Sequence, residues 1–162
     1  MRPTYYNLEC NGTFWSEVVR KMFAGTFEHS LDEKGRVIIP SKFREGLTDV
    51  FYVTLGGKGS LSLYPQPEWE KLKEKLKTST KITAKDIKVF YANACECELD
   101  KQGRTLISSK LREYAGISRD VYINGAANKV EIWDREAWKE YVGEEKEALM
   151  EMSAAIEEID ML

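Results

Sequence analysis

The chain has 162 residues, of which 43% are hydrophobic and 31% are charged. This length is sufficient for one large domain or two small domains, each with a hydrophobic core. The apolar fraction is too high for a disordered chain, and no apolar run approaches the roughly 20 residues that a membrane-spanning helix needs. The three cysteines are an odd number, which does not suit a disulfide scaffold. The composition therefore predicts a cytoplasmic protein without a membrane partner.

The net charge of −3 is unevenly distributed along the chain. Residues 134–162 contain ten acidic and three basic side chains, so residues 1–133 carry a net charge of +4. A protein that is acidic overall can still bind nucleic acid if its cations lie on one face. The acidic C-terminal region therefore does not exclude a DNA partner.

Residues 22–66 have the pattern of a small module with four strands and one short helix. Asp32 and Gly35 favour a bulged hairpin turn, because Asp accepts backbone hydrogen bonds and Gly adopts the left-handed conformation. Pro40 and Gly46 mark the start and the end of the helix. The expected elements are strand 27–31, turn 32–36, strand 37–39, helix 41–46, and strands 50–55 and 60–64 around a glycine-rich hairpin loop at 56–59.

Residues 67–92 are predicted to form a helical connector, and residues 93–134 repeat the first module at an offset of 68. Between residues 31–47 and 99–115, nine of seventeen positions are identical. A repeat of this kind determines the fold, because each copy supplies the same supersecondary unit. Helices are expected at 68–77 and 84–93, followed by strands 93–99 and 104–107, helix 109–115, and strands 121–124 and 129–133.

Residues 135–162 are predicted to form a long C-terminal helix, continuous from Arg135 to Ile159. Apolar residues recur along it at spacings of three and four, which is typical of a seam for another helix. Packing of this helix on its own domain and a contact between subunits explain the seam equally well.

These elements predict an α+β fold in which the two modules depend on each other. A module of four short strands and one helical turn is too small to close its own barrel, and it leaves strand edges unpaired. Two copies can cover these edges by interleaving their hairpins into one closed sheet. We therefore expect tandem modules interleaved within the chain, with flanking helices.

Several segments of the chain resemble the MraZ family. They include both turns with the motif Asp-x-x-x-Arg, and two such motifs at this spacing are highly specific. The resemblance covers residues 22 to about 142. The segments that carry it are 22–45, 61–65, 68–70, 99–104 and 131–134.

The resemblance implies a bacterial transcriptional regulator with two AbrB-like ββαββ halves that form a swapped-hairpin barrel. Members of the family assemble into rings, associate with the nucleoid, and bind tandem short repeats in the promoter of the division and cell-wall gene cluster. We therefore expect double-stranded promoter DNA and further copies of this chain as partners. No cofactor, small-molecule substrate or enzymatic activity is expected.

The candidate DNA-binding residues are cations on the two turns and on the helices that follow them. Such cations can contact phosphates, and an Arg at a hairpin tip can also offer two hydrogen bonds to guanine. The alternative is that they are solvated charges, or that each turn Arg only pairs with its Asp. The resemblance favours DNA binding for Arg36 and, more weakly, for Lys34, Lys42, Arg44, Lys101, Arg104, Lys110 and Arg112. The predicted structural residues of the turns are Asp32, Gly35, Asp100 and Gly103.

Other reactive side chains do not form a recognisable site in the sequence. His29 is the only histidine and is expected at a surface or rim position. Cys95 and Cys97 alternate on a strand, so both thiols are expected on one face, toward the core. A zinc site would need further ligands at suitable spacing, and no nucleophile–base pattern or P-loop is present. We predict neither a metal site nor an enzyme.

A second class of function is also compatible with the sequence. An AbrB-like interaction protein, or a scaffold of the antitoxin kind, would bind a protein partner through the acidic C-terminal helix. The helix seam and the negative net charge favour this alternative. The paired basic turns and the MraZ resemblance favour the DNA-binding regulator.

Residues 1–21 have no counterpart in the family pattern, which begins at Met22. We expect them to be a non-native extension that results from a misassigned start codon. The alternative is a genuine arm, in which aromatic residues pack on the protein and Arg2, Arg20 and Lys21 contact DNA.

Overall fold

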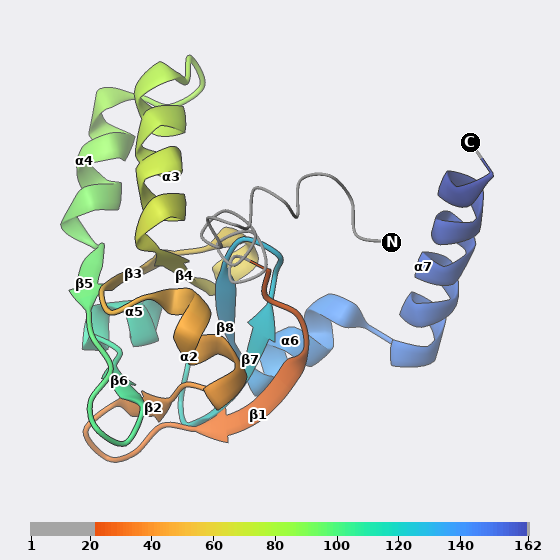
Figure 1. Cartoon of the computed structure of the whole chain (residues 1–162), viewed down its shortest axis with the longest axis horizontal. Coiled ribbons are helices and arrows are strands. Elements are labelled where there is room, and N and C mark those ends of the chain that lie inside the picture. The colour runs from red at the N-terminus through yellow and green to blue at the C-terminus, as the bar shows by residue number, and fades with distance from the viewer. Residues whose placement is uncertain (1–21, 162) are drawn as a thin grey trace, which may run out of the picture.

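Strands from the two halves of the chain alternate across one antiparallel sheet in the computed structural model, which describes residues 22–161 (Figure 1). The order of the six strands is β1 (Thr26–Ser30), β7 (Asp120–Gly125), β8 (Val130–Asp134), β4 (Leu61–Pro65), β3 (Phe51–Leu55) and β5 (Cys95–Cys97). Thus β1 of the first half pairs with β7 of the second half, and β5 of the second half pairs with β3 of the first. A separate two-stranded sheet pairs β2 (Arg36–Ile38) with β6 (Arg104–Leu106).

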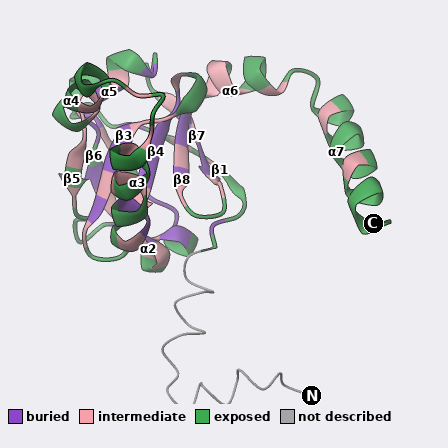
Figure 2. Ribbon diagram, turned by 90° about the horizontal axis from the view of Figure 1, so that it is seen from above, coloured by how far each residue is buried: buried purple, intermediate pink, exposed green. Residues whose placement is uncertain are grey.

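The hydrophobic core lies between the sheet and two short helices, α2 (Ser41–Leu47) and α5 (Ser109–Tyr114). Figure 2 shows the buried residues concentrated on the strands. Phe43 of α2 is buried, and its ring makes edge contacts with Phe23 and Phe27 at centroid distances of 5.8 and 5.3 Å. Leu111 occupies the repeat-related position on α5 and is also buried. Each half therefore contributes one helix to a single shared core.

Strands of the two halves pair with each other, but they do not form the one closed sheet that was expected. β2 and β6 are each three residues long and lead within three residues into α2 and α5. They pair with each other and not with the six-stranded sheet. The predicted strands and short helices are all present, with shifts of a residue or two at their ends. The glycine-rich hairpin loop contains a short 3₁₀ turn, η2 (Gly57–Gly59).

Two helices, α3 (Gln66–Thr78) and α4 (Ala84–Ala92), form a hairpin at one end of the molecule. Trp69 anchors this hairpin to the sheet, because its ring stacks on Tyr52 at 4.6 Å and on Phe90 at 5.7 Å. The side chain of Thr83 accepts a hydrogen bond from the backbone N–H of Asp86, whose carboxylate accepts one from the backbone N–H of Thr83. This capping box fixes the start of α4.

The prediction of one continuous helix after the second module is wrong. The segment forms two helices, α6 (Arg135–Val142) and α7 (Glu145–Asp160), separated at Gly143. Gly143 has a φ of +74°, a left-handed conformation that ends α6, and the carboxylate of Glu144 caps α7 by accepting from the backbone N–H of Lys146 and Glu147. α6 packs on β7 and β8, whereas α7 extends away from the sheet (Figures 1 and 2).

No helix within residues 22–161 is long and apolar enough to cross a membrane. Residues 1–21, and with them the predicted non-native extension, lie outside the described residues.

Candidate nucleic-acid interface

The two basic turns have nearly the same geometry. In the first, Oδ1 of Asp32 accepts hydrogen bonds from the backbone N–H of Lys34 at 3.0 Å and of Arg36 at 2.9 Å. Its Oδ2 accepts from Nε of Arg36 at 2.7 Å. In the second turn, Asp100 accepts from the backbone N–H of Arg104 at 2.9 Å and from its Nε at 2.8 Å. The Asp side chains thus accept hydrogen bonds from the backbone of each turn and from the Arg side chain that follows it.

These hydrogen bonds keep both turn carboxylates ionised. The backbone N–H of Arg36, and then its guanidinium, hold the pKa of Asp32 below its usual value. The same bonds from Arg104 lower the pKa of Asp100. Only Nε of each arginine is hydrogen-bonded to its Asp, so the Nη groups are not part of the ion pair.

The two arginines differ at these Nη groups. Nη2 of Arg104 lies 3.4 Å from Oε1 of Gln102, whereas the equivalent position in the first turn is Lys34, which adds a second cation. About 31% of the Arg36 side chain and 27% of the Arg104 side chain are exposed. Arg36 is therefore the better placed of the two for an incoming acceptor.

The pairing of β2 with β6 brings both arginines to one face of a two-stranded ribbon. Arg36 lies opposite Leu106, and Ile38 lies opposite Arg104. Because side chains alternate along a strand, these four residues share the outer face, while Val37 and its partner on β6 are buried on the other side. The ribbon therefore presents two cations and two aliphatic side chains in a pattern that is nearly two-fold symmetric.

Arg44 and Arg112, two other predicted DNA-binding residues, make a structural contact between the halves. Nε of Arg44 donates to the carbonyl of Ile39 at 2.8 Å, and Nε of Arg112 donates to the carbonyl of Ile107 at 3.1 Å. Each guanidinium then lies against the turn glycine of the opposite half: Arg44 against Gly103 and Arg112 against Gly35. Both side chains are part-buried beneath the turns.

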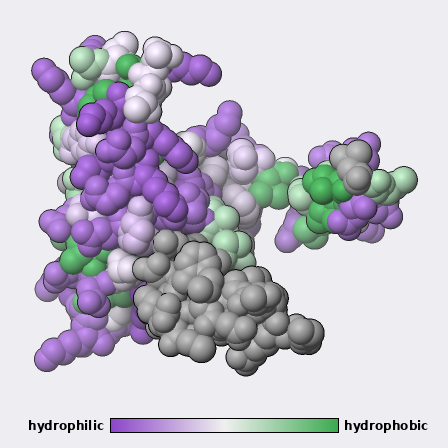
Figure 3. Space-filling view, turned by 45° about the horizontal axis from the view of Figure 1, so that its top comes forward, coloured by the Kyte–Doolittle hydropathy of each residue, from purple (hydrophilic) through white to green (hydrophobic). Residues whose placement is uncertain are grey.

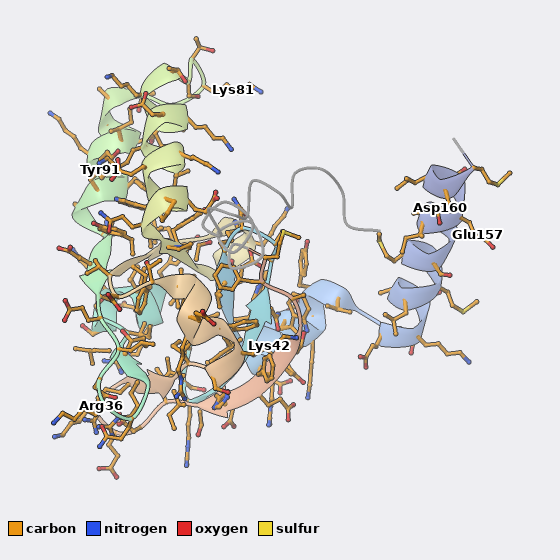
Figure 4. The ribbon with its side chains drawn as sticks, in the orientation of Figure 1. Arg36, Lys42, Lys81, Tyr91, Glu157 and Asp160 are labelled. Carbon is orange, nitrogen blue, oxygen red and sulfur yellow. The ribbon has the colours of Figure 1, made fainter. Side chains whose placement is uncertain are left out.

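The predicted lysines are exposed but are not all brought together. Lys34 and Lys101 lie on the two turns, whereas Lys42 and Lys110 lie on the first turns of α2 and α5. Nζ of Lys42 is close to Gly25, and Figure 4 shows this residue well apart from Arg36. The structure therefore groups the turn cations with the ribbon and places Lys42 elsewhere.

His29, Cys95 and Cys97 are the other reactive side chains considered from the sequence. His29 lies half-buried on β1, and burial, followed by the charge of Arg44, lowers its pKa. Cys95 and Cys97 both pack against the core, and burial raises the pKa of Cys97. Within residues 22–161, no group of three or more His, Cys, Asp and Glu side chains could hold a metal ion.

Comparison with known proteins also divides the chain into two repeated halves. The family model described as "MraZ protein, putative antitoxin-like" matches the chain twice, at residues 22–89 and 90–157. A protein named Transcriptional regulator MraZ from Acetivibrio thermocellus is 51% identical over 128 residues, or 76% of this chain and 89% of that protein. Proteins of the same name from Halothermothrix orenii and Desulforamulus reducens are 45% and 41% identical over 85% and 87% of this chain, and over 99% and 100% of their own lengths. The chain belongs to the MraZ family.

The two MraZ matches correspond to the two halves that exchange strands in the structure. The first match contains β2 and the second contains β6, so each repeat supplies one strand of the ribbon. The resemblance seen in the turn motifs is thereby confirmed.

The two aliphatic residues of the ribbon face, Ile38 and Leu106, were not among the residues predicted from the sequence. Ile38 is 41% exposed and Leu106 is 57% exposed. Both lie in short β-branched or apolar runs that are typical of a buried strand. The available signal was the two-residue alternation with the turn Arg, which places Ile38 on the face of Arg36 and Leu106 on the face of Arg104.

We expect Gly103→Ala to destabilise the protein, mainly through its left-handed backbone conformation and further through the contact with Arg44 of the other half. Gly103 has a φ of +76°, and a Cβ there would lie 2.3 Å from Cζ of Arg44. A left-handed conformation costs an L-residue about 1–2 kcal/mol, so the free energy of unfolding should fall by at least about 1 kcal/mol in urea titration. Gly57→Ala is the matched control, because that position has space for a Cβ and lacks a positive φ. Equal effects of the two substitutions would contradict this account.

Proposed function

We propose that this chain is a sequence-specific DNA-binding transcriptional regulator that uses the β2–β6 ribbon to contact promoter DNA. Its MraZ relatives carry the name of a transcriptional regulator, which describes a function other than catalysis. The observation that carries the proposal is the joint face of Arg36, Ile38, Arg104 and Leu106. The B-DNA major groove admits a two-stranded ribbon of this kind.

The chemistry of the face suits base recognition as well as phosphate contact. The Nη end of Arg36 can donate two hydrogen bonds to O6 and N7 of a guanine, while Nε remains on Asp32. The exposed side chains of Ile38 and Leu106 can make apolar contacts with the methyl group of a thymine. Lys34 and Lys101 on the turns add phosphate contacts. Arg44 and Arg112 contribute mainly by holding the turns from below.

One ribbon covers only a few base pairs, so a single chain binds weakly. We infer that several copies, joined in a ring-shaped oligomer, contact short tandem repeats together. As the MraZ resemblance implies, these repeats lie in the promoter of the division and cell-wall gene cluster, and the protein is associated with the nucleoid. The AbrB-like swapped-hairpin arrangement belongs to the same proposal, and the strand exchange between the halves supports it.

The competing function is a scaffold that binds a protein partner through the C-terminal helix. The exposed apolar residues of α7, among them Leu149 and Ile159, favour it. A filter-binding titration with salt separates the two functions. Specific DNA binding predicts a log–log slope of about −0.9 per phosphate contact, whereas a scaffold shows little DNA binding at any salt concentration.

Arg36→Ala should remove specific binding and leave the fold unchanged, since this side chain lies on the outer face of the ribbon. Loss of a bidentate contact to a base costs about 1–3 kcal/mol per site, so affinity should fall at least tenfold in fluorescence anisotropy with the promoter DNA upstream of its own gene. Arg104→Ala should have a smaller effect, because Gln102 engages Nη2 of Arg104. Lys81→Ala, which removes one charge at the far end of the molecule, is the control (Figure 4). Unchanged affinity and salt slope in Arg36→Ala would refute the assignment.

The spacing of the repeats should matter as much as their sequence. Copies that are linked in one oligomer gain roughly 10²–10⁴ in affinity only if all their ribbons reach the same side of the DNA. We therefore expect repeats spaced by about 10 base pairs or a multiple of it. Insertion of about 5 base pairs between two repeats, which is half a helical turn, should weaken binding strongly in footprinting. A full-turn insertion is the control, and indifference to both insertions would exclude multivalent binding.

A further inference from the structure

The helices that follow the two modules occupy equivalent positions in the repeat, but they pack differently. After the first module, α4 folds back on α3, and Phe90 of α4 stacks on Trp69 of α3. After the second module, α6 carries Trp138 at the equivalent position, but α7 turns away at Gly143. The repeat therefore leaves α7 without the helix partner that α4 has (Figure 1).

α7 carries an apolar stripe that is largely uncovered within residues 22–161. Only its first member, Leu149, borders a hollow, which Trp138 and Val142 of α6 also line. The stripe recurs at spacings of three and four residues, which places its members on one side of the helix. These side chains are between 47% and 65% exposed. Figure 3 shows hydrophobic surface gathered on this separate lobe. The members of the stripe are Leu149, Met152, Ile156 and Ile159.

The α3–α4 hairpin, for its part, leaves apolar side chains at its surface. It consists of only two helices, and no residue of α4 is fully buried. Leu76 and Ile87 lie at the centre of the hairpin and line hollows of about 420 and 340 Å³ on its surface. Val89 is 47% exposed beside the second hollow. A third helix laid along this pair would bury the remaining apolar area, which is the usual arrangement of packed helices.

The charges of the two elements are complementary. The hairpin from Gln66 to Ala92 contains seven lysines and four acidic residues, whereas α7 contains six acidic residues and one lysine. Two lysines, Lys73 and Lys77, and one acidic residue, Glu74, border the larger hollow. Opposite potentials of this kind steer association and exclude partners of like charge.

We propose that α7 of one copy docks in the α3–α4 hairpin of a second copy of this chain. The inference deepens the proposed function, because it assigns the interface that builds the oligomer. The two surfaces are different, so the contact is head-to-tail and repeats from copy to copy until a ring closes. It also leaves the ribbon uncovered, because Arg36 lies at the opposite end of the molecule from the hairpin tip at Lys81 (Figure 4).

Two other partners for the stripe fit the structure less well. Pairing of α7 with α7 of another copy would bring together two helices with five net negative charges each. Docking on the hairpin of the same chain would require α7 to cross the molecule, because Glu157 and Asp160 lie far from Lys81 and Tyr91 (Figure 4). Both remain as outcomes that the experiment distinguishes.

The test uses two full-length variants that each break one side of the contact. Lys73→Glu/Lys77→Glu reverses the charge beside the hollow and leaves α7 intact. Met152→Glu/Ile156→Glu places charge in the stripe and leaves the hairpin intact. The matched controls are Lys75→Glu/Lys88→Glu, which do not line the hollows, and Met150→Glu/Ala154→Glu, on the opposite side of α7. Circular dichroism checks that every variant keeps its fold.

Sedimentation velocity of the variants gives a result specific to a head-to-tail contact. Each interface variant alone should be monomeric, and an equimolar mixture should form a dimer and stop there, because only one intact pair of surfaces remains. The control variants should keep the mass of the unmodified protein. The proposal is overturned if the hairpin variant keeps that mass, as pairing of α7 with α7 predicts. It is equally overturned if the mixture stays monomeric, as docking within one chain predicts.

The same proteins separate this inference from the proposed function. If the unmodified protein fails to bind the promoter DNA but the variants dimerise on mixing, the interface stands and the DNA-binding function fails. If DNA binding occurs and the hairpin variant keeps its full mass, the function stands and the interface is wrong.

Discussion

Each basic turn of this protein is held in place by the other half of the chain. The backbone N–H of Ile39 donates to the carbonyl of Gly103, and the backbone N–H of Ile107 donates to the carbonyl of Gly35. The guanidinium of Arg44 lies against Gly103, and that of Arg112 lies against Gly35. These reciprocal contacts require a small residue at each glycine and a long cation on each following helix. The duplication supplies both, so the ribbon exists only where the two repeats meet.

This dependence explains how a small fold can present a defined interface. A two-stranded ribbon with three-residue strands is not stable alone in water, and its side chains would be mobile. Here the turn Asp fixes Nε of each Arg, the opposite half supports the turn from below, and the shared core buries Val37. The side chains on the outer face are therefore pre-organised, which lowers the entropy cost of binding.

The sequence was sufficient to predict the repeat and the strands and short helices, because these depend on local hydrogen bonds and spacing. It was not sufficient to separate Arg44 from Arg36. Both are cations near a turn, and only the crossing of the halves places Arg44 beneath Gly103. It also did not indicate that α6 ends at Gly143, since apolar spacing continues past that glycine. The apolar runs around Ile38 and Leu106 are typical of buried strands, and only the alternation with the turn Arg places these two side chains on the outer face.

Single-amide hydrogen exchange of Arg44→Ala tests the support between the halves most directly. Arg44 belongs to the first half, but its guanidinium lies against the turn of the second. The backbone N–H groups of Gly103 and Arg104, both bonded to Asp100, should exchange faster, while those of Gly35 and Arg36 should keep their rates. Faster exchange confined to Gly35 and Arg36, or an equal increase in both turns, would contradict the account.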